Sequence, residues 1–100
     1  DIMYSIKLAD GTELTNLELN GNNFIPKTLD KTVFIGNLET VTITDSDGNS
    51  EERVNQKVQF ASIGETETFI LMDKSMDEIE KEELMLAIAE LASMVVGGGV

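Results

Sequence analysis

The sequence lacks three residue types on which many enzyme sites depend. Its 100 residues include no cysteine, no histidine and no tryptophan. Without cysteine the chain can form neither a disulfide nor a thiolate nucleophile or cysteine metal site. Without histidine it lacks the commonest general base and the commonest metal ligand. We therefore expect no enzymatic activity, no cofactor and no metal, and no small-molecule substrate is evident.

Basic residues are also scarce. Seven Lys and Arg stand against 19 Asp and Glu, which gives a net charge of −12. This charge repels nucleic-acid phosphates and anionic membranes, so we expect no direct nucleic-acid binding. The N-terminal residues Asp1-Ile2-Met3 are not a basic stretch followed by an apolar one. No secretory signal is therefore predicted, and the expected location is cytoplasmic.

The chain length predicts a single domain, residues 1–100, because 100 residues can build one modest core. Within it we expect a β-rich body at residues 1–72 and a C-terminal helix at 75–96. Gly97-Gly98-Gly99 disfavours helix, so residues 97–100 are expected to be a flexible tail.

Alternating apolar residues and turn signals predict about six short strands. Residues 2–8 alternate with period two, and Asp10-Gly11 and Asn20-Gly21 supply the residues that tight turns need. The predicted strands are 2–8, 12–19, 23–25, 38–44, 51–63 and 66–72. Residues 27–37 are expected to form a helical turn or short strand that places Phe34 under the sheet. Short connections favour antiparallel pairing, so the predicted fold class is α+β, a small antiparallel sheet or barrel-like meander followed by one long helix.

The C-terminal helix is predicted to begin at Ser75, an N-cap residue followed by acidic residues in the first turn. Its second half, Leu84–Val96, is apolar on nearly every side. One apolar stripe, expected to pack in the domain's own core, contains Leu84, Ile88, Leu91 and Val95. The second stripe, predicted to bind a partner, contains Met85, Ala89, Ala92 and Val96. The alternative is that one fold buries both stripes.

The same segment is not expected to insert into a membrane. Its thirteen residues are interrupted by Glu90 and are too few to span a bilayer core of about 30 Å.

The loop Asp45–Glu51 carries oxygen ligands at alternate positions, as calcium-binding loops do, but its glycine is fourth and Gln56 stands at the twelfth position. An ordinary turn at Asp47-Gly48 is the alternative, and we favour it.

Acidic residues are dense in two segments, and a fold that joined them would imitate a phosphate backbone. The simpler interpretation is a solvated surface. The residues concerned are Asp45, Asp47, Glu51, Glu52, Glu78, Glu80, Glu82 and Glu83.

Two segments resemble small uncharacterised proteins from prophage structural gene modules of Gram-positive gut bacteria. They are YSIKLADGTELTNLELNGNNFI, residues 4–25, and EKEELMLAIAELASMV, residues 80–95. The resemblance implies a virion, assembly or accessory component with no known reaction, located in the host cytoplasm or in the virion.

Together these features predict a non-catalytic protein-interaction module that oligomerises, or docks on a phage assembly protein, through its C-terminal helix. The alternative is an acidic, nucleic-acid-mimicking inhibitor of a host nucleic-acid-binding protein, of the anti-CRISPR type.

Overall fold

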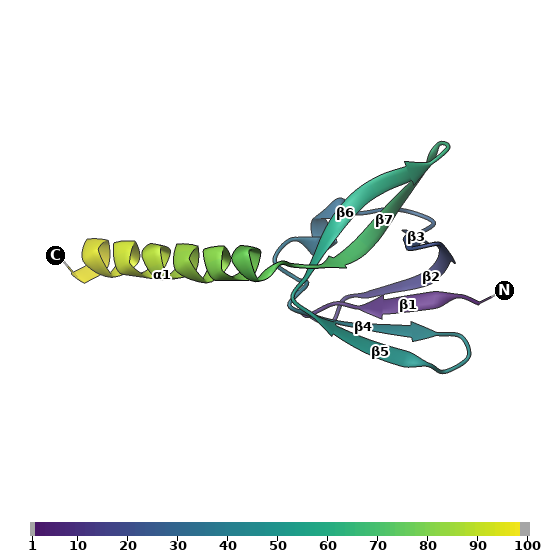
Figure 1. Ribbon diagram of the computed structural model, residues 1–100, viewed down its shortest axis with the longest axis horizontal. Helices are drawn as coiled ribbons and strands as arrows, with labels where there is room; N and C mark the ends of the chain where they lie inside the picture. Colours follow the sequence, from purple (N-terminus) through teal and green to yellow (C-terminus); the bar gives the residue numbers. More distant parts are fainter. Residues whose placement is uncertain (1, 99–100) are drawn as a thin grey trace.

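The computed structural model describes residues 2–98 of the chain, with side chains as far as Ala92. Within that range the chain forms an antiparallel sheet, one short 3-10 helix and one α-helix (Figure 1). This confirms the predicted α+β class. The elements are β1 (Tyr4–Lys7), β2 (Glu13–Asn20), β3 (Asn23–Ile25), η1 (Lys31–Phe34), β4 (Thr40–Asp45), β5 (Ser50–Val54), β6 (Gln56–Ile63), β7 (Thr66–Asp73) and α1 (Met76–Gly98).

The strands form one sheet in the order β5-β4-β1-β2-β3-β7-β6. Strand β2 is central because its first half pairs with β1 and its second half pairs with β3. Within the part of β2 that pairs with β1 there is a bulge: Tyr4 lies opposite Leu17, whereas Ile6 lies opposite Leu14. Asn16, inside the bulge, has a φ of 55°, which asparagine tolerates better than most residues. The bulge bends β2, so the sheet can curve around a core.

The predicted turns at Gly11 and Gly21 are confirmed, with φ values of 92° and 64°. The predicted single strand 51–63 is wrong, because Asn55 divides it into β5 and β6. Asn55 has a φ of 51°; its N–H donates to the Glu39 carbonyl at 2.9 Å, and its carbonyl accepts from the Lys74 N–H at 3.0 Å. Since β5 and β6 are the two edges of the sheet, this residue is the corner at which the sheet folds back. The β4–β5 and β6–β7 hairpins diverge from it (Figure 1).

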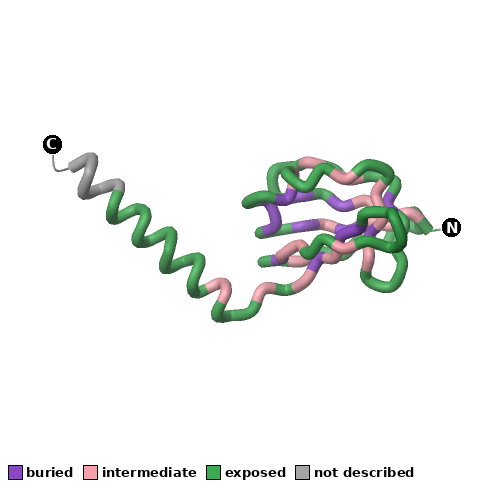
Figure 2. Tube along the Cα trace, turned by 90° about the horizontal axis from the view of Figure 1, so that it is seen from above, coloured by how far each residue is buried: buried purple, intermediate pink, exposed green. Residues whose placement is uncertain are grey.

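The core lies between the two halves of the curved sheet and is organised around aromatic rings. The Phe69 ring centroid lies 5.5 Å from that of Phe24 and 4.9 Å from that of Phe34. The short helix η1 places Phe34 there, as the sequence predicted. The buried apolar residues are Ile6, Leu8, Leu17, Phe24, Phe34, Leu38, Val41, Ile43, Phe69 and Leu71. All belong to the body, residues 2–73, and Figure 2 shows that α1 projects from it.

Helix α1 extends along the longest dimension of a molecule that measures 60 × 30 × 24 Å. It reaches Gly98, two residues beyond the predicted end at Val96. Once a helix has nucleated, each further residue gains a hydrogen bond, so a glycine can be included despite its low helix propensity. The other two residues of the predicted tail, Gly99 and Val100, lie outside the described residues.

Candidate protein-interaction site

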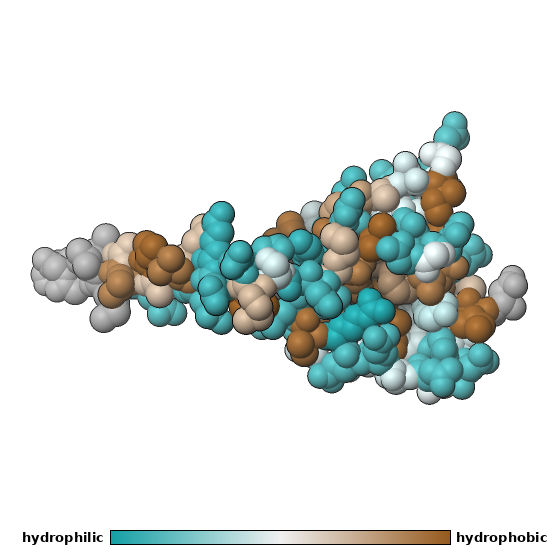
Figure 3. Space-filling model, in the orientation of Figure 1, coloured by the Kyte–Doolittle hydropathy of each residue, from teal (hydrophilic) through white to brown (hydrophobic). Residues whose placement is uncertain are grey.

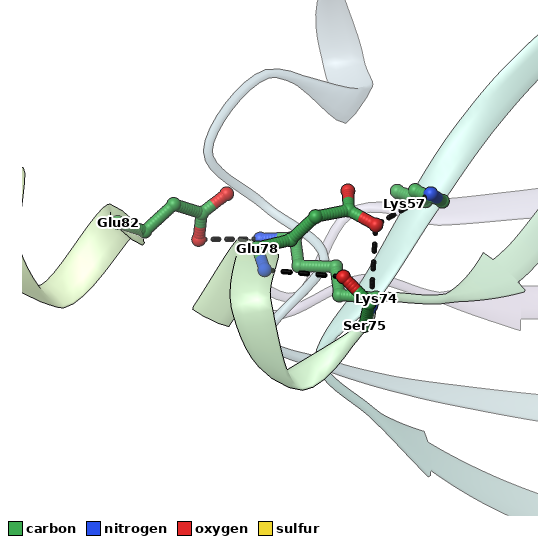
Figure 4. Close-up of polar contacts among 5 residues, drawn as sticks. All are labelled: Lys57, Lys74, Ser75, Glu78 and Glu82. Atoms are coloured by element: carbon green, nitrogen blue, oxygen red, sulfur yellow. Dashed lines mark hydrogen bonds and ion pairs between the residues drawn. The ribbon is translucent and has the colours of Figure 1, made fainter. Parts of the chain in front are cut away.

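The root of α1, residues 75–83, is held to the body by polar contacts (Figure 4). Ser75 is the N-cap, as predicted: its Oγ accepts from the Glu78 N–H at 3.1 Å, and its own N–H donates to Glu78 Oε1 at 3.2 Å. This reciprocal pair is a capping box. Lys57 on β6 donates to the same Glu78 oxygen at 2.7 Å, and Lys74 donates to Glu82 Oε2 at 2.7 Å. These contacts set the direction in which α1 leaves the body.

The electrostatics of the root follow from the same contacts. The hydrogen bond from Lys57, together with that from the Ser75 N–H, lowers the pKa of Glu78 to about 2. Glu78 is therefore ionised at neutral pH and lies in the first turn of α1, where a negative charge interacts favourably with the helix dipole. The root thus combines a cap, two ion pairs and a favourable charge position.

Beyond the root, α1 exposes its apolar side chains. Leu84, Met85, Leu86, Ile88 and Leu91 are each between 57% and 64% exposed. Ala89 and Ala92 are also exposed. Figure 3 shows apolar residues along this distal segment, Leu84–Ala92, next to the polar root. The distal segment is therefore an apolar surface that the described residues leave mostly uncovered.

The structure places the predicted partner-binding residues on this surface. Met85, Ala89 and Ala92 lie along one side of the distal segment and are exposed. The fourth, Val96, lies outside the residues whose side chains are described.

The prediction that the first stripe packs in the domain's own core is wrong for Leu84, Ile88 and Leu91, because all three are exposed. Val95 lies outside the described side chains. The core is already filled by the rings around Phe69, and the polar contacts of the root direct α1 away from the sheet. The charged side chains of the root are exposed or only partly buried, and the ion pair with Lys57 outweighs the partial desolvation of Glu78.

A groove of about 790 Å³ lies where α1 leaves the body. Its apolar wall is formed by Phe34, Leu38, Val58, Ile79, Met85 and Leu86. Gln56 also lines the groove, and its Nε2 donates to the Val54 carbonyl at 3.0 Å and to Asp73 Oδ1 at 2.6 Å. The Gln56 Oε1 atom is buried and has no hydrogen-bond partner within the described part of the chain. Sequence reasoning did not identify this groove, because no local pattern distinguishes Gln56 from other polar strand residues.

The acidic loop between β4 and β5 is a self-contained turn. Asp45 Oδ1 accepts from the N–H groups of Asp47 and Asn49, each at 2.9 Å, and its Oδ2 accepts from Asn49 Nδ2 at 3.0 Å. The hydrogen bonds from Asn49 lower the pKa of Asp45. Gly48 has a φ of 88°, which confirms the predicted turn at Asp47-Gly48. The Asp45 carboxylate thus stabilises its own loop.

The two acidic segments lie apart. The β4–β5 loop is at the end of its hairpin remote from α1 (Figure 1). Within residues 2–92, three carboxylates are paired with basic side chains: Glu51 with Arg53, Glu78 with Lys57 and Glu82 with Lys74. The fold therefore does not join the loop and the root of α1 into one acidic face. Among the described residues, no group of three or more acidic side chains is arranged to hold a metal ion.

Comparisons with protein-family models, with curated proteins and with solved structures gave no match for this chain. In the described part of the chain, no helix has the length and apolar character needed to cross a membrane.

Proposed function

We propose that this protein is a non-catalytic interaction module that associates with protein partners through the distal segment of α1. The observation that carries the proposal is the exposure of five large apolar side chains along a helix that the body does not cover. Burying such side chains is the main source of favourable free energy in protein association. Exposed apolar patches of this kind mark interaction surfaces.

The direction of α1 supports the proposal. Two ion pairs of 2.7 Å and the capping box fix the root, so the distal segment is presented away from the sheet. A pre-ordered helix loses less conformational entropy on binding than a disordered segment does. The net charge of −12 opposes non-specific aggregation of this apolar surface.

The sequence resemblance supplies a setting for this function. We propose that the protein is a structural or accessory component of a phage or prophage, acting by assembly and not by catalysis. Self-association is the simplest form of that role, because it requires no other protein.

The test is the molar mass measured by light scattering after size exclusion. We expect the wild-type chain to exceed the monomer mass of 10.9 kDa, and Met85→Glu with Ala92→Glu to return it to a monomer. Thr28→Glu with Ser62→Glu is the matched control, because it adds the same charge at two exposed positions of the body. The control should keep the wild-type mass. A monomeric wild-type chain at all concentrations would contradict self-association.

A further inference from the structure

Three turns of the body contain an Asp or an Asn that is followed by glycine. The pairs are Asp10-Gly11, Asn20-Gly21 and Asp47-Gly48. In such a pair the glycine nitrogen can attack the side-chain carbonyl carbon of the preceding residue and close a succinimide ring. Glycine has no Cβ to obstruct this approach, and an amide is a better electrophile than an ionised carboxylate. Asn20, the only one of the seven asparagines that is followed by glycine, therefore has the most reactive sequence.

The three glycine N–H groups differ in their hydrogen bonds. The Gly11 N–H donates to the Leu8 carbonyl at 3.0 Å, and the Gly48 N–H donates to the Asp45 carbonyl at 3.1 Å. The Gly21 N–H donates to no backbone carbonyl in the described part of the chain. A nitrogen that is held by a hydrogen bond must first break that bond before it can attack a side chain. Of the three nitrogens, only that of Gly21 is therefore free to attack.

The side-chain amide of Asn20 is also available. Asn20 is exposed, and its amide makes no hydrogen bond to the residues that the structure describes. Other asparagine side chains are held in place: Asn37 Nδ2 donates to the Val33 carbonyl at 2.9 Å, and Asn49 Nδ2 donates to Asp45 Oδ2 at 3.0 Å. Asn20 thus combines a free amide with a free nucleophile on the next residue.

The position of Asn20 in the sheet makes the required movement local. Asn20 lies opposite Asn23 in the last pair of the β2–β3 hairpin, and Gly21, with a φ of 64°, is in the exposed turn that follows. Ring closure requires the main chain at Asn20 to leave its extended conformation, which opens this last pair. Such terminal openings need far less free energy than unfolding of the core. The reaction can therefore occur in the folded protein.

The product would disturb the strand pairing next to the turn. In isoaspartate the main chain passes through the side-chain carbons, so the end of β2 gains a methylene group. The adjoining pair is Leu19 with Phe24, and Phe24 is a buried core residue whose ring centroid lies 5.5 Å from that of Phe69. A longer main chain at position 20 thus alters the register that places Phe24 in the core.

We propose that Asn20 is a site of spontaneous deamidation, which converts it to isoaspartate and destabilises the β2–β3 hairpin. In the first step a bond forms between Gly21 N and Asn20 Cγ, the Cγ–Nδ2 bond breaks, and ammonia leaves with the proton that Gly21 N has lost. In the second step water opens the ring. Its oxygen bonds to the main-chain carbonyl carbon of Asn20, and its hydrogen goes to the Gly21 nitrogen, which stays attached to Cγ. This inference goes beyond the proposed function and does not depend on it, because α1 takes no part in the reaction.

The first test compares two Asn-Gly pairs in one molecule. Asp47→Asn places the same dipeptide in the turn where the Gly48 N–H is held by the Asp45 carbonyl. The protein is incubated in mildly alkaline buffer, and isoaspartate is located by mass spectrometry of proteolytic fragments. We expect position 20 to react about five to ten times faster than position 47, because the hydrogen bond of Gly48 must break first.

The same incubation in urea is the control for sequence effects. Neither turn is formed there, so positions 20 and 47 should react at similar rates. Equal rates in the folded protein would overturn the inference. A difference of the same size in urea would also overturn it, because the difference would then arise from neighbouring residues in the sequence and not from the fold.

The second test measures the effect on stability. Deamidation adds one negative charge to the net charge of −12, so ion exchange can separate the isoaspartate form from unmodified protein. Freshly prepared Asn20→Asp is the matched control, because it has the same charge and an unchanged main chain. We expect a lower urea midpoint for the isoaspartate form and a wild-type midpoint for Asn20→Asp. Equal midpoints for the two would contradict the proposed effect on the hairpin.

Asn20→Gln tests whether the acidic form arises at this residue. Glutamine keeps an amide, but its longer side chain would have to close a larger ring, which forms much more slowly. We therefore expect the acidic form to be absent from Asn20→Gln after the incubation that produces it in wild type. Its appearance at the wild-type rate would overturn the assignment to Asn20.

Discussion

The body and the distal segment of α1 use apolar residues in opposite ways. In the body, ten apolar residues are buried around the Phe69 ring, and polar residues such as Asn55 and Gln56 hold the corner. In the distal segment, five large apolar side chains are more than half exposed. The body therefore has a core that is complete without α1. The apolar residues of the distal segment do not contribute to that core, which leaves them available for contact with other chains.

The largest expected effect separates the two regions directly. Phe69→Ala removes the ring that contacts both Phe24 and Phe34, so we expect it to lower the free energy of unfolding by about 3–5 kcal/mol. Leu91→Ala, in dilute monomeric protein, should change it by less than about 0.5 kcal/mol, because Leu91 is exposed. Urea denaturation followed by circular dichroism measures both. Similar losses in the two variants would show that α1 packs on the body.

The corner at Asn55 gives the next largest effect within the body. Its φ of 51° suits asparagine or glycine and disfavours alanine. The free energy of unfolding of Asn55→Ala should therefore be about 1–2 kcal/mol lower than that of Asn55→Gly. In urea denaturation, Asn55→Ala should unfold at the lower urea concentration. Both variants keep the backbone N–H that bonds to Glu39. Equal midpoints for alanine and glycine would mean that the corner does not require a positive φ.

Features that are determined by a few adjacent residues could be predicted from the sequence. The turns at Gly11, Gly21 and Gly48 were predictable because a few adjacent residues determine each of them. The same is true of the cap at Ser75 and of the alternating strand that begins near Tyr4. In each case the physical cause, such as a positive φ or a capping oxygen, lies within the motif itself.

Features that depend on distant residues were not predictable in this way. The corner at Asn55 interrupts a run that reads as one strand, and its hydrogen bonds are made with Glu39 and Lys74. The groove beside Gln56 is lined by residues from distant segments of the chain, such as Phe34 and Met85. The exposure of Leu84 could not be predicted from the apolar stripe to which it belongs. Such a stripe indicates that burying its side chains is favourable, but it does not identify which surface, in the same domain or in another chain, covers them. That surface depends on whether the core of the body is already full.

A smaller effect is expected at the junction between the two regions. Ser75→Ala removes the oxygen that accepts from the Glu78 N–H, and loss of an N-cap destabilises a helix by about 1 kcal/mol. Amide hydrogen exchange should become faster in the first turns of α1 and stay unchanged in β6 and β7. Ser75→Asp retains a capping oxygen and should exchange like wild type. Faster exchange throughout the body would show that the two regions unfold as one unit.

The smallest expected effect is a dependence of folding stability on pH, and it also arises at the junction between the body and α1. The pKa of Glu78 is about 2 in the folded protein, below its ordinary value of 4.5, because Lys57 donates a hydrogen bond to the carboxylate. A lowered pKa means that the ionised group stabilises the fold fully above about pH 4.5 and that this contribution is lost as the pH falls towards 2. Glu78→Gln should therefore be less stable than wild type at neutral pH, and the difference should shrink over that interval.

Glu80→Gln is the matched control for this titration, because Glu80 is exposed and forms no ion pair within the described residues. Both variants remove one negative charge from the root of α1, so they change long-range electrostatics similarly. Only Glu78→Gln also removes the negative charge that pairs with Lys57, whereas its amide oxygen keeps an acceptor for the Ser75 N–H. Urea midpoints measured at several pH values should therefore separate the two variants at neutral pH and bring them together near pH 2. Parallel curves for the two variants would mean that Lys57 does not hold α1 to the body.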